Sequence, residues 1–195
     1  MNIDLLKSEI EASIKVKRKL LEDEKLLDQV LEVSRECLKT LLDGGKIIFC
    51  GNGGSFADAQ HLSAEFTSRF LFDRPAMASI ALGTNNSGLT AMGNDYGYEN
   101  IFSRELEALG KPEDMLIGIT TSGNSANIIK GVDAANKIGI TTFILTGESG
   151  GKLKGLADCI QIPSTDTARI QECHILVGHI ICGFVEKAMF NDYSN

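Results

Sequence analysis

A short apolar run that ends in a glycine-rich turn is the feature that most constrains the fold of this chain. Residues 46–50 (KIIFC) have the pattern of a buried strand, and the turn GNGGS at 51–55 follows without a gap. Apolar residues at helical spacing then continue from about Phe56 to Arg69. A strand that enters a helix through a tight turn is typical of sheets whose strands run parallel.

The same order of strand, polar turn and helix occurs again in the second half of the chain. The strand pattern MLIGI at 115–119 runs into the turn TTSGNS at 120–125 and then into a helix that ends near Ile138. Three further runs have the composition of short strands: residues 79–82, 141–145 and 159–162. Residues 167 to about 190 form a last helical pattern. This alternation predicts a mostly parallel α/β sheet with helices on both faces, and it puts both polar turns at carboxyl ends of strands, where such sheets bind ligands.

Two helices are predicted before the first strand. Residues 3–42 carry apolar side chains at helical spacing, the phase of the pattern changes near Glu22–Glu24, and Gly44-Gly45 closes the second helix as a left-handed cap requires. At 195 residues the chain fits one domain, 1–195, with residues 1–45 as an N-terminal helical arm. An amphipathic pair of this length favours packing in an oligomer.

Composition excludes several classes of partner. A formal net charge of −7 opposes nonspecific binding to nucleic acid, which needs a basic surface. Five widely spaced cysteines without a C-x-x-C pair indicate reduced thiols packed as small hydrophobes. The first residues lack the apolar core of a signal peptide, and no later run approaches membrane-spanning length. We therefore expect a cytoplasmic protein that binds neither nucleic acid nor membranes.

Both polar turns have the composition of an anion-binding site. Gly51, Gly53 and Gly54 allow backbone N–H groups to point at an anion, and Ser55 adds a hydroxyl at a helix N-terminus. Either turn alone could be a simple capped turn, and the first lacks the lysine of nucleoside triphosphatases and the spacing of dinucleotide-binding folds. Two such turns in the same topological setting predict one phosphorylated ligand, held without positive charge. The second turn offers four hydroxyls: Thr120, Thr121, Ser122 and Ser125.

Four polar residues in two helices are candidates for chemistry. His61 and Glu65 lie four residues apart, so they share a helix face and could converge on one substrate or one metal ion, although a simple surface pair has the same spacing. Gln171 and His179 are separated by about 12 Å of helical rise, which suits one ion only if both reach inward or two subunits interleave. His174, one turn from Gln171, is interpreted as a packed histidine.

Five motifs are spread along the chain: GNGGS at 51–55, QHLSAEF at 60–66, NDYGYENIF at 94–102, TTSGNSAN at 120–127 and ARIQECHI at 168–175. Together they resemble the phosphoheptose isomerase family of the sugar isomerase (SIS) superfamily. The resemblance covers nearly the whole chain. It implies a flavodoxin-like three-layer sandwich, assembled as a homotetramer with active sites between subunits. It also implies an aldose–ketose isomerase that converts sedoheptulose 7-phosphate to D-glycero-D-manno-heptose 7-phosphate through an enediol, the first step toward bacterial heptose for lipopolysaccharide or capsule.

The resemblance also implies roles for individual residues. Glu65 and His179 would form the acid–base pair, and a zinc ion would be held by His61, Glu65, Gln171 and His179. The two roles of Glu65 compete, because a carboxylate bound tightly to zinc is a poor base. The substrate contacts that the resemblance implies are Asn52, Gly53, Gly54, Ser55, Glu65, Asn94, Asp95, Thr120, Thr121, Ser122, Ser125 and Gln171, with Asn94 and Asp95 facing the sugar hydroxyls.

One departure from the family and three alternatives remain. Some members carry an aspartate where this chain has Ala168, with Asp166 two residues earlier, so a role for that aspartate is not carried over. A noncatalytic SIS protein that binds a partner such as a replication initiator would lack the glutamate and histidine found here at 65 and 179. A sugar-phosphate-sensing regulator would need a DNA-binding segment that this chain lacks. An isomerase for a five- or six-carbon phosphate stays open.

Overall fold

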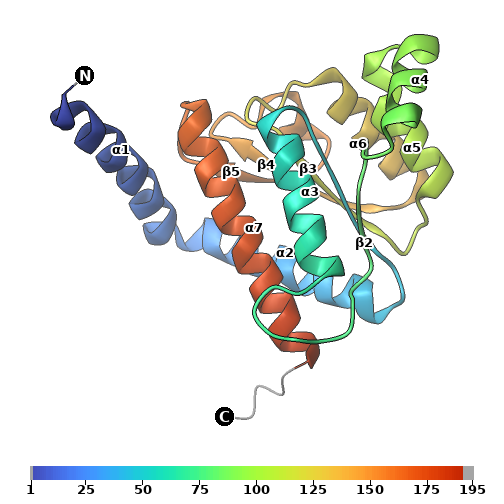
Figure 1. Ribbon diagram of the computed structural model, residues 1–195, viewed down its shortest axis with the longest axis horizontal. Coiled ribbons are helices and arrows are strands. Elements are labelled where there is room, and N and C mark those ends of the chain that lie inside the picture. The colour runs from blue at the N-terminus through green and yellow to red at the C-terminus, as the bar shows by residue number, and fades with distance from the viewer. Residues whose placement is uncertain (1, 191–195) are drawn as a thin grey trace.

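Five parallel strands form the central sheet in the order β2-β1-β3-β4-β5 (Figure 1). The computed structural model describes residues 2–190. Each of the five predicted strand positions is confirmed, and the strand order is that of the flavodoxin-like fold. The strands are β1 (Ile47–Gly51), β2 (Ser79–Ala81), β3 (Met115–Ile119), β4 (Thr141–Gly147) and β5 (Asp158–Ile162).

Helices cover both faces of the sheet, which completes the predicted three layers. One layer contains α1 (Ile3–Glu22), α2 (Glu24–Leu42), α3 (Gly54–Thr67) and α7 (Thr167–Phe190). The other contains α4 (Asn86–Tyr96), α5 (Ile101–Leu109) and α6 (Ala126–Ile138), with short 3₁₀ turns at Tyr98–Asn100 and Gly151–Gly155. Successive residues of a strand point to opposite faces of the sheet, so Phe49 packs in the core under the first layer and Ile48 in the core under the second.

The sequence pattern did not predict α4 and α5. No residue of α4 is buried, and its sequence NSGLTAMGNDY has no apolar stripe for a periodicity argument to detect. In contrast, α5 buries Ile101, Phe102 and Leu106 in the core that it shares with α6. The helices therefore form where packing, rather than an obvious repeat, favours them.

The N-terminal pair is confirmed, with its break at Asp23. The side chain of Asp23 accepts a hydrogen bond from the Leu26 amide at 3.0 Å and so caps α2. Beyond α2, Gly44 has a φ of +85°, the left-handed geometry expected of the glycine pair. Only Val16 and Leu20 of α1 are buried, and the first half of this helix projects from the body of the protein (Figure 1).

The apolar composition of α7 reflects its place in the core. By length and composition alone this helix could cross a membrane, but half of its apolar segment is buried inside the protein. It packs against α2 and α3, as a core helix does (Figure 1). The expectation that no run approaches membrane-spanning length was therefore wrong for the sequence of α7, and burial explains the composition.

The five cysteines are free and buried, which confirms their interpretation as small hydrophobes. Burial raises the pKa of the Cys50 thiol to about 12 and that of Cys159 to about 11. These thiols stay protonated near neutral pH, so they are poor nucleophiles and poor metal ligands.

Candidate active site

The two predicted turns lie side by side at the ends of β1 and β3, where the strand order of the sheet reverses. After β1 the chain turns into α3 on one face, and after the neighbouring β3 it turns into α6 on the other, which is the usual ligand position in such sheets. Two amide hydrogen bonds join the turns: Asn52 Nδ2 donates to Asn127 Oδ1 at 2.9 Å, and Asn127 Nδ2 donates to Asn52 Oδ1 at 2.8 Å. Tyr98 also donates to Asn52 Oδ1. The Asn52 side chain thus holds the turns together, a role that the motif did not suggest.

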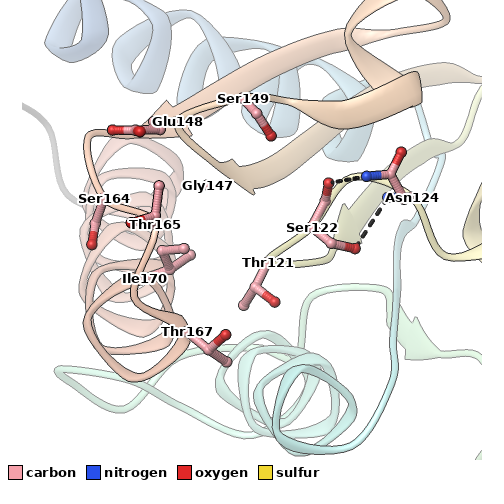
Figure 2. A pocket seen from close by; sticks show the side chains of 10 residues that line it. All are labelled: Thr121, Ser122, Asn124, Gly147, Glu148, Ser149, Ser164, Thr165, Thr167 and Ile170. Atoms are coloured by element: carbon pink, nitrogen blue, oxygen red, sulfur yellow. Dashed lines mark hydrogen bonds between the residues drawn. The ribbon is translucent and has the colours of Figure 1, made fainter.

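A polar pocket of about 250 Å³ lies beside the second turn. Figure 2 shows Thr121, Ser122 and Asn124 on one side of this pocket and residues near the start of α7 on the other. Thr121 and Ser122 therefore line a polar pocket at the carboxyl end of the sheet. Thr120 is buried, and its hydroxyl lies 3.3 Å from that of Ser125. The full lining is Thr121, Ser122, Asn124, Gly147, Glu148, Ser149, Ser164, Thr165, Thr167 and Ile170.

Four hydroxyls of this pocket were missed from the sequence. They follow β4 or β5, so the carboxyl-end rule that identified the first two turns could have found them. Asp166 lies among them and accepts hydrogen bonds from the amides of Ala168 at 2.8 Å and Arg169 at 3.3 Å. It therefore caps the N-terminus of α7. The missed residues are Ser149, Ser164, Thr165 and Thr167.

The first turn contacts α7 through Gln171. A Cβ added to Gly54 would lie 2.7 Å from Gln171 Nε2, so the amide side chain packs directly against the glycine. Gly53, with a φ of +56°, is the residue before α3, and Ser55 is buried in its first turn. Gln171 therefore lies at the first polar turn rather than beside His179.

His61, Glu65 and His179 converge on the outer side of α3 and α7. One ligand atom of each lies within 4.8 Å of the others, and His61 Nε2 is 2.9 Å from Glu65 Oε1. The rings of His61 and His179 meet edge to face, with centroids 5.0 Å apart. We call these three residues the trio. The predicted meeting of Glu65 with His179 thus occurs within a single chain.

A glycine on α7 permits this convergence. A Cβ added to Gly178 would lie 2.5 Å from the δ carbons of Leu62, so a larger residue there would displace the buried Leu62 side chain or separate α7 from α3. Close approach of the two helices brings His179 beside the neighbours of Leu62 on α3. The sequence pattern did not identify this glycine, because its partner lies more than 100 residues away.

The trio fits a zinc ion on the chemistry of its donors. Two imidazoles and one carboxylate are ordinary zinc ligands, and three protein ligands leave a position open for water or substrate. His179 Nε2 is buried and has no hydrogen-bond partner among the described residues, as an atom reserved for a ligand would be. Gln171, the fourth predicted ligand, lies about 12 Å along α7 from His179. The predicted ligand set is therefore only partly assembled here.

Asp58 is a neighbour of the trio that sequence reasoning missed. It lies one turn before His61 on α3, and its carboxyl group interacts electrostatically with His61 and His179. Burial nevertheless raises the pKa of Asp58 above its ordinary value, with the two histidines opposing the rise. The spacing 58, 61, 65 follows one helix face and could have revealed it.

Two predicted site residues lie elsewhere. Asn94 and Asp95 are exposed on α4, where Asn94 Nδ2 donates to Asp95 Oδ1 at 2.8 Å. Asp95 lines a separate groove between α4 and α5, so within the described residues of one chain neither side chain lines the hydroxyl pocket.

His174 is a core residue, as interpreted from the sequence. It is fully buried, its Nε2 lies 3.2 Å from the Thr146 carbonyl oxygen, and burial lowers its pKa to about 4. It is therefore neutral at physiological pH.

Known proteins resemble this chain along almost its whole length. The SIS domain family model matches residues 11–147. A phosphoheptose isomerase of Aneurinibacillus thermoaerophilus is 53% identical over 190 residues, which are 97% of this chain and 96% of the relative. The solved structure of phosphoheptose isomerase GmhA from Neisseria gonorrhoeae superposes with a TM-score of 0.88 at 39% identity, covering 94% of this chain and 98% of its own. That from Francisella tularensis has a TM-score of 0.90 at 34% identity, covering 96% and 100%.

Proposed function

Because this chain belongs to the phosphoheptose isomerase family of SIS-domain proteins and is a sugar phosphate isomerase, we propose that its substrate is sedoheptulose 7-phosphate. The product would be D-glycero-D-manno-heptose 7-phosphate, a precursor for lipopolysaccharide or capsule heptose. The observation that carries the proposal is the approach of Glu65 to His179 within 4.8 Å, which supplies two proton-transfer groups at one point. The noncatalytic alternative is not favoured, since the relatives at about half identity are named as isomerases.

The chemistry that we propose moves one proton between carbons and one between oxygens. Glu65 removes a proton from C1 of the ketose while His179 donates a proton to O2, which gives a cis-enediol. Glu65 then returns its proton to C2, and His179 takes the proton of O1, so the aldose forms and both residues regain their starting states. An imidazole can donate a proton and take one back, which suits His179 to both halves of the cycle.

The phosphate group would be held by the hydroxyls of the polar pocket. Thr121 and Ser122 line that pocket, and the start of α7 adds the hydroxyl of Thr167. The backbone of Gly53 and Gly54, with Gln171 against it, would contact the same ligand from the first turn. The lining residues that the structure describes include no Lys or Arg, and Glu148 is the one charged residue among them, so hydroxyl donors would hold the phosphate and favour release of a charged product.

We propose zinc as the cofactor, held by His61, Glu65 and His179 with Gln171 as the predicted fourth ligand. A bound zinc would supply a Lewis acid that polarises sugar oxygens. The support is the donor set of the trio and the unpartnered His179 Nε2. We also propose a cytoplasmic location on the basis of the five free thiols, which cell fractionation would test.

Purified protein is expected to convert sedoheptulose 7-phosphate, with new aldose signals followed by NMR. Fructose 6-phosphate and arabinose 5-phosphate, assayed at the same concentration, are the controls for chain length. Conversion of either control without conversion of the heptulose would refute the substrate assignment. Inactivity on every sugar by a folded oligomer would favour the partner-binding alternative.

We propose that residues 1–45 form the oligomerisation arm of a single domain spanning 1–195, and that a homotetramer completes the active site. Leu6 and Ile10 are 61% and 60% exposed on the projecting half of α1, and Ile3 and Ile14 extend the same apolar stripe. The hydroxyl pocket lies at the N-terminal end of α7 and the trio near its middle, since Thr167 and His179 are separated by about 18 Å of helical rise. A second copy would bring a pocket and a trio closer together, and it would also bring Asn94 and Asp95 toward the sugar.

The double variant Leu6→Glu/Ile10→Glu is expected to shift the protein from tetramer toward smaller species in sedimentation velocity, because two carboxylates cannot be buried in an apolar contact. Leu156→Glu is the control, since Leu156 is 39% exposed after the second 3₁₀ turn and lies outside residues 1–45. A wild type that sediments as a monomer, or a double variant that remains tetrameric, would refute this use of the arm.

A further inference from the structure

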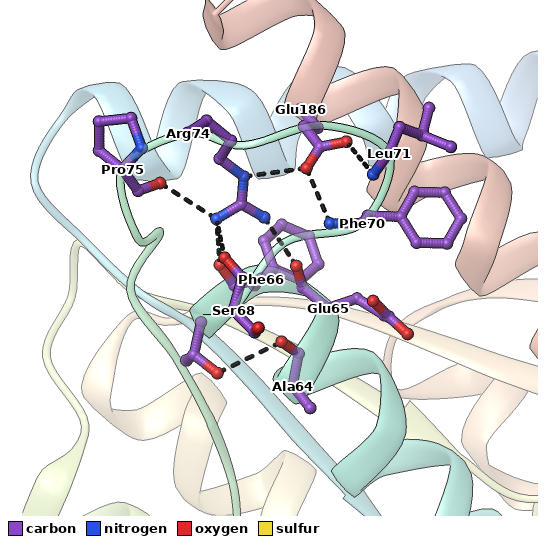
Figure 3. Close-up of polar contacts among 10 residues, drawn as sticks. Ala64, Glu65, Phe66, Ser68, Phe70, Leu71, Arg74, Pro75 and Glu186 are labelled. Atoms are coloured by element: carbon purple, nitrogen blue, oxygen red, sulfur yellow. Dashed lines mark hydrogen bonds and ion pairs between the residues drawn. The ribbon is translucent and has the colours of Figure 1, made fainter.

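A buried ion pair lies beyond the trio, between the segment after α3 and the last turns of α7. Arg74 Nε donates to Glu186 Oε1 at 3.0 Å, and the two side chains are 1% and 0% exposed (Figure 3). Taking two charges out of water costs several kcal/mol per ion, and an apolar pair of the same size is often as stable. Such a pair stabilises the fold only if further hydrogen bonds satisfy both groups, so the partners of each group matter.

The guanidinium of Arg74 holds the C-terminal end of α3. Its Nη2 donates to the Glu65 carbonyl oxygen at 2.7 Å, and its Nη1 donates to the carbonyl oxygens of Phe66 and Ser68, each at 2.8 Å (Figure 3). These carbonyls belong to the last turn of the helix, where they lack helical partners and where a positive charge is favourable. Arg74 therefore bonds directly to the backbone of Glu65, a member of the trio.

The carboxylate of Glu186 acts on the surroundings of His179, another member of the trio. Glu186 lies two turns after His179 on α7, and its oxygens accept hydrogen bonds from the amides of Phe70 at 2.9 Å and Leu71 at 2.7 Å. The ring of Phe70 stacks on the imidazole of His179, with centroids 5.3 Å apart and an interplanar angle of 30°. Glu186 thus holds the backbone of Phe70, whose ring packs on the His179 imidazole.

We infer that Arg74 and Glu186 are positioning residues that set the separation of Glu65 and His179. The ion pair joins two series of contacts. Arg74 donates to the Glu65 carbonyl oxygen, and Glu186 accepts from the amide of Phe70, whose ring packs on His179. Removing either group frees the end of α3 to rotate relative to α7, which moves a carboxylate away from an imidazole. Positioned proton transfer loses about 100-fold in rate for a displacement of 1 Å.

The effect on catalysis rests on the proposed function, so the test includes a readout that does not. The variant Arg74→Lys keeps the positive charge near Glu186 but cannot donate to Glu65, Phe66 and Ser68 together, because an ammonium lacks the planar fork of arginine. We expect kcat on sedoheptulose 7-phosphate to fall at least about tenfold while KM changes by less than about twofold. A residue that serves only the fold would lower the melting temperature and the active fraction, with kcat per folded molecule unchanged.

The three histidines provide the second readout. In protein labelled with ¹³C at histidine Cε1, Arg74→Lys is expected to shift the signals of His61 and His179. His174 lies against β4 on the core side of α7, and its signal should stay in place. Glu186→Gln should produce the same pattern, and it replaces Arg74→Lys if that variant does not fold.

Asp114→Asn is the matched control, because Asp114 is also a buried carboxylate that accepts two backbone amides and a cation. Its partners are the amides of Lys46 and Lys111 and the Lys46 ammonium, in segments before β1 and β3 that hold no member of the trio. We expect lower stability without movement of the His61 and His179 signals. Unchanged signals and unchanged kcat in both Arg74→Lys and Glu186→Gln would overturn the inference, as would equal shifts in Asp114→Asn. If the wild type is inactive on the heptulose, the proposed substrate fails and the histidine signals alone decide the positioning role.

Discussion

Replacing Glu65 with Gln is expected to lower kcat on sedoheptulose 7-phosphate by about 10²- to 10⁴-fold, the contribution typical of a positioned general base. The amide has nearly the same size and can still accept a hydrogen bond from His61, but it cannot take a proton from carbon. The Glu65 side chain is 20% exposed, so the substitution leaves no deeply buried group unpaired. Steady-state kinetics by NMR or a coupled assay would measure the loss, with the melting temperature as the check on folding.

His61→Gln separates the two roles of Glu65. His61 contacts Glu65 at 2.9 Å and belongs to the trio, but it has no proton-transfer role in the proposed mechanism. If Glu65 acts as the base, Glu65→Gln and His179→Gln should both lose far more activity than His61→Gln. Equal losses of activity in all three variants would instead assign Glu65 to metal binding, provided that calorimetry shows a parallel loss of zinc affinity. A Glu65→Gln enzyme with nearly wild-type kcat would contradict both roles.

Gly123→Ala is expected to raise KM at least about tenfold, because it strains the wall of the hydroxyl pocket. Gly123 has a φ of +64°, and an added Cβ would lie 2.0 Å from the Gly150 carbonyl oxygen. The left-handed backbone alone costs about 1–2 kcal/mol of folding stability for a residue with a side chain. A loss of about 1.4 kcal/mol of substrate binding from displaced hydroxyls would give the tenfold change. Relief of the clash must separate the turns after β3 and β4, which carry Ser122 and Ser149.

Gly155→Ala is the control for this effect. It lies in the short 3₁₀ turn that follows the same loop, no atom lies within 4 Å of its added Cβ, and its φ is not positive. We expect KM and melting temperature close to those of the wild type. A Gly123→Ala enzyme that folds and keeps the wild-type KM would indicate that the phosphate binds elsewhere.

Local patterns in the sequence were enough for the strands, the turns and the helices that carry the site. The apolar run at 47–51 and the glycines at 51–54 act on their own neighbours, so backbone preference and alternation identify them without knowledge of the fold. The spacing of His61 and Glu65 likewise predicts that they share a helix face. The same reasoning failed for α4, whose exposed residues show no period.

Only the tertiary structure decided which of these residues meet. His179 faces Glu65 while Gln171 faces Gly54, because α3 and α7 pack side by side in one register, with Gly178 against Leu62. The ion pair of Arg74 and Glu186 then joins the C-terminal ends of α3 and α7. Contacts between residues more than 100 positions apart depend on how whole helices pack, and no pattern of near neighbours encodes that register. The sequence therefore determined the elements and the chemical groups they carry, whereas packing between distant helices determined which groups share a site.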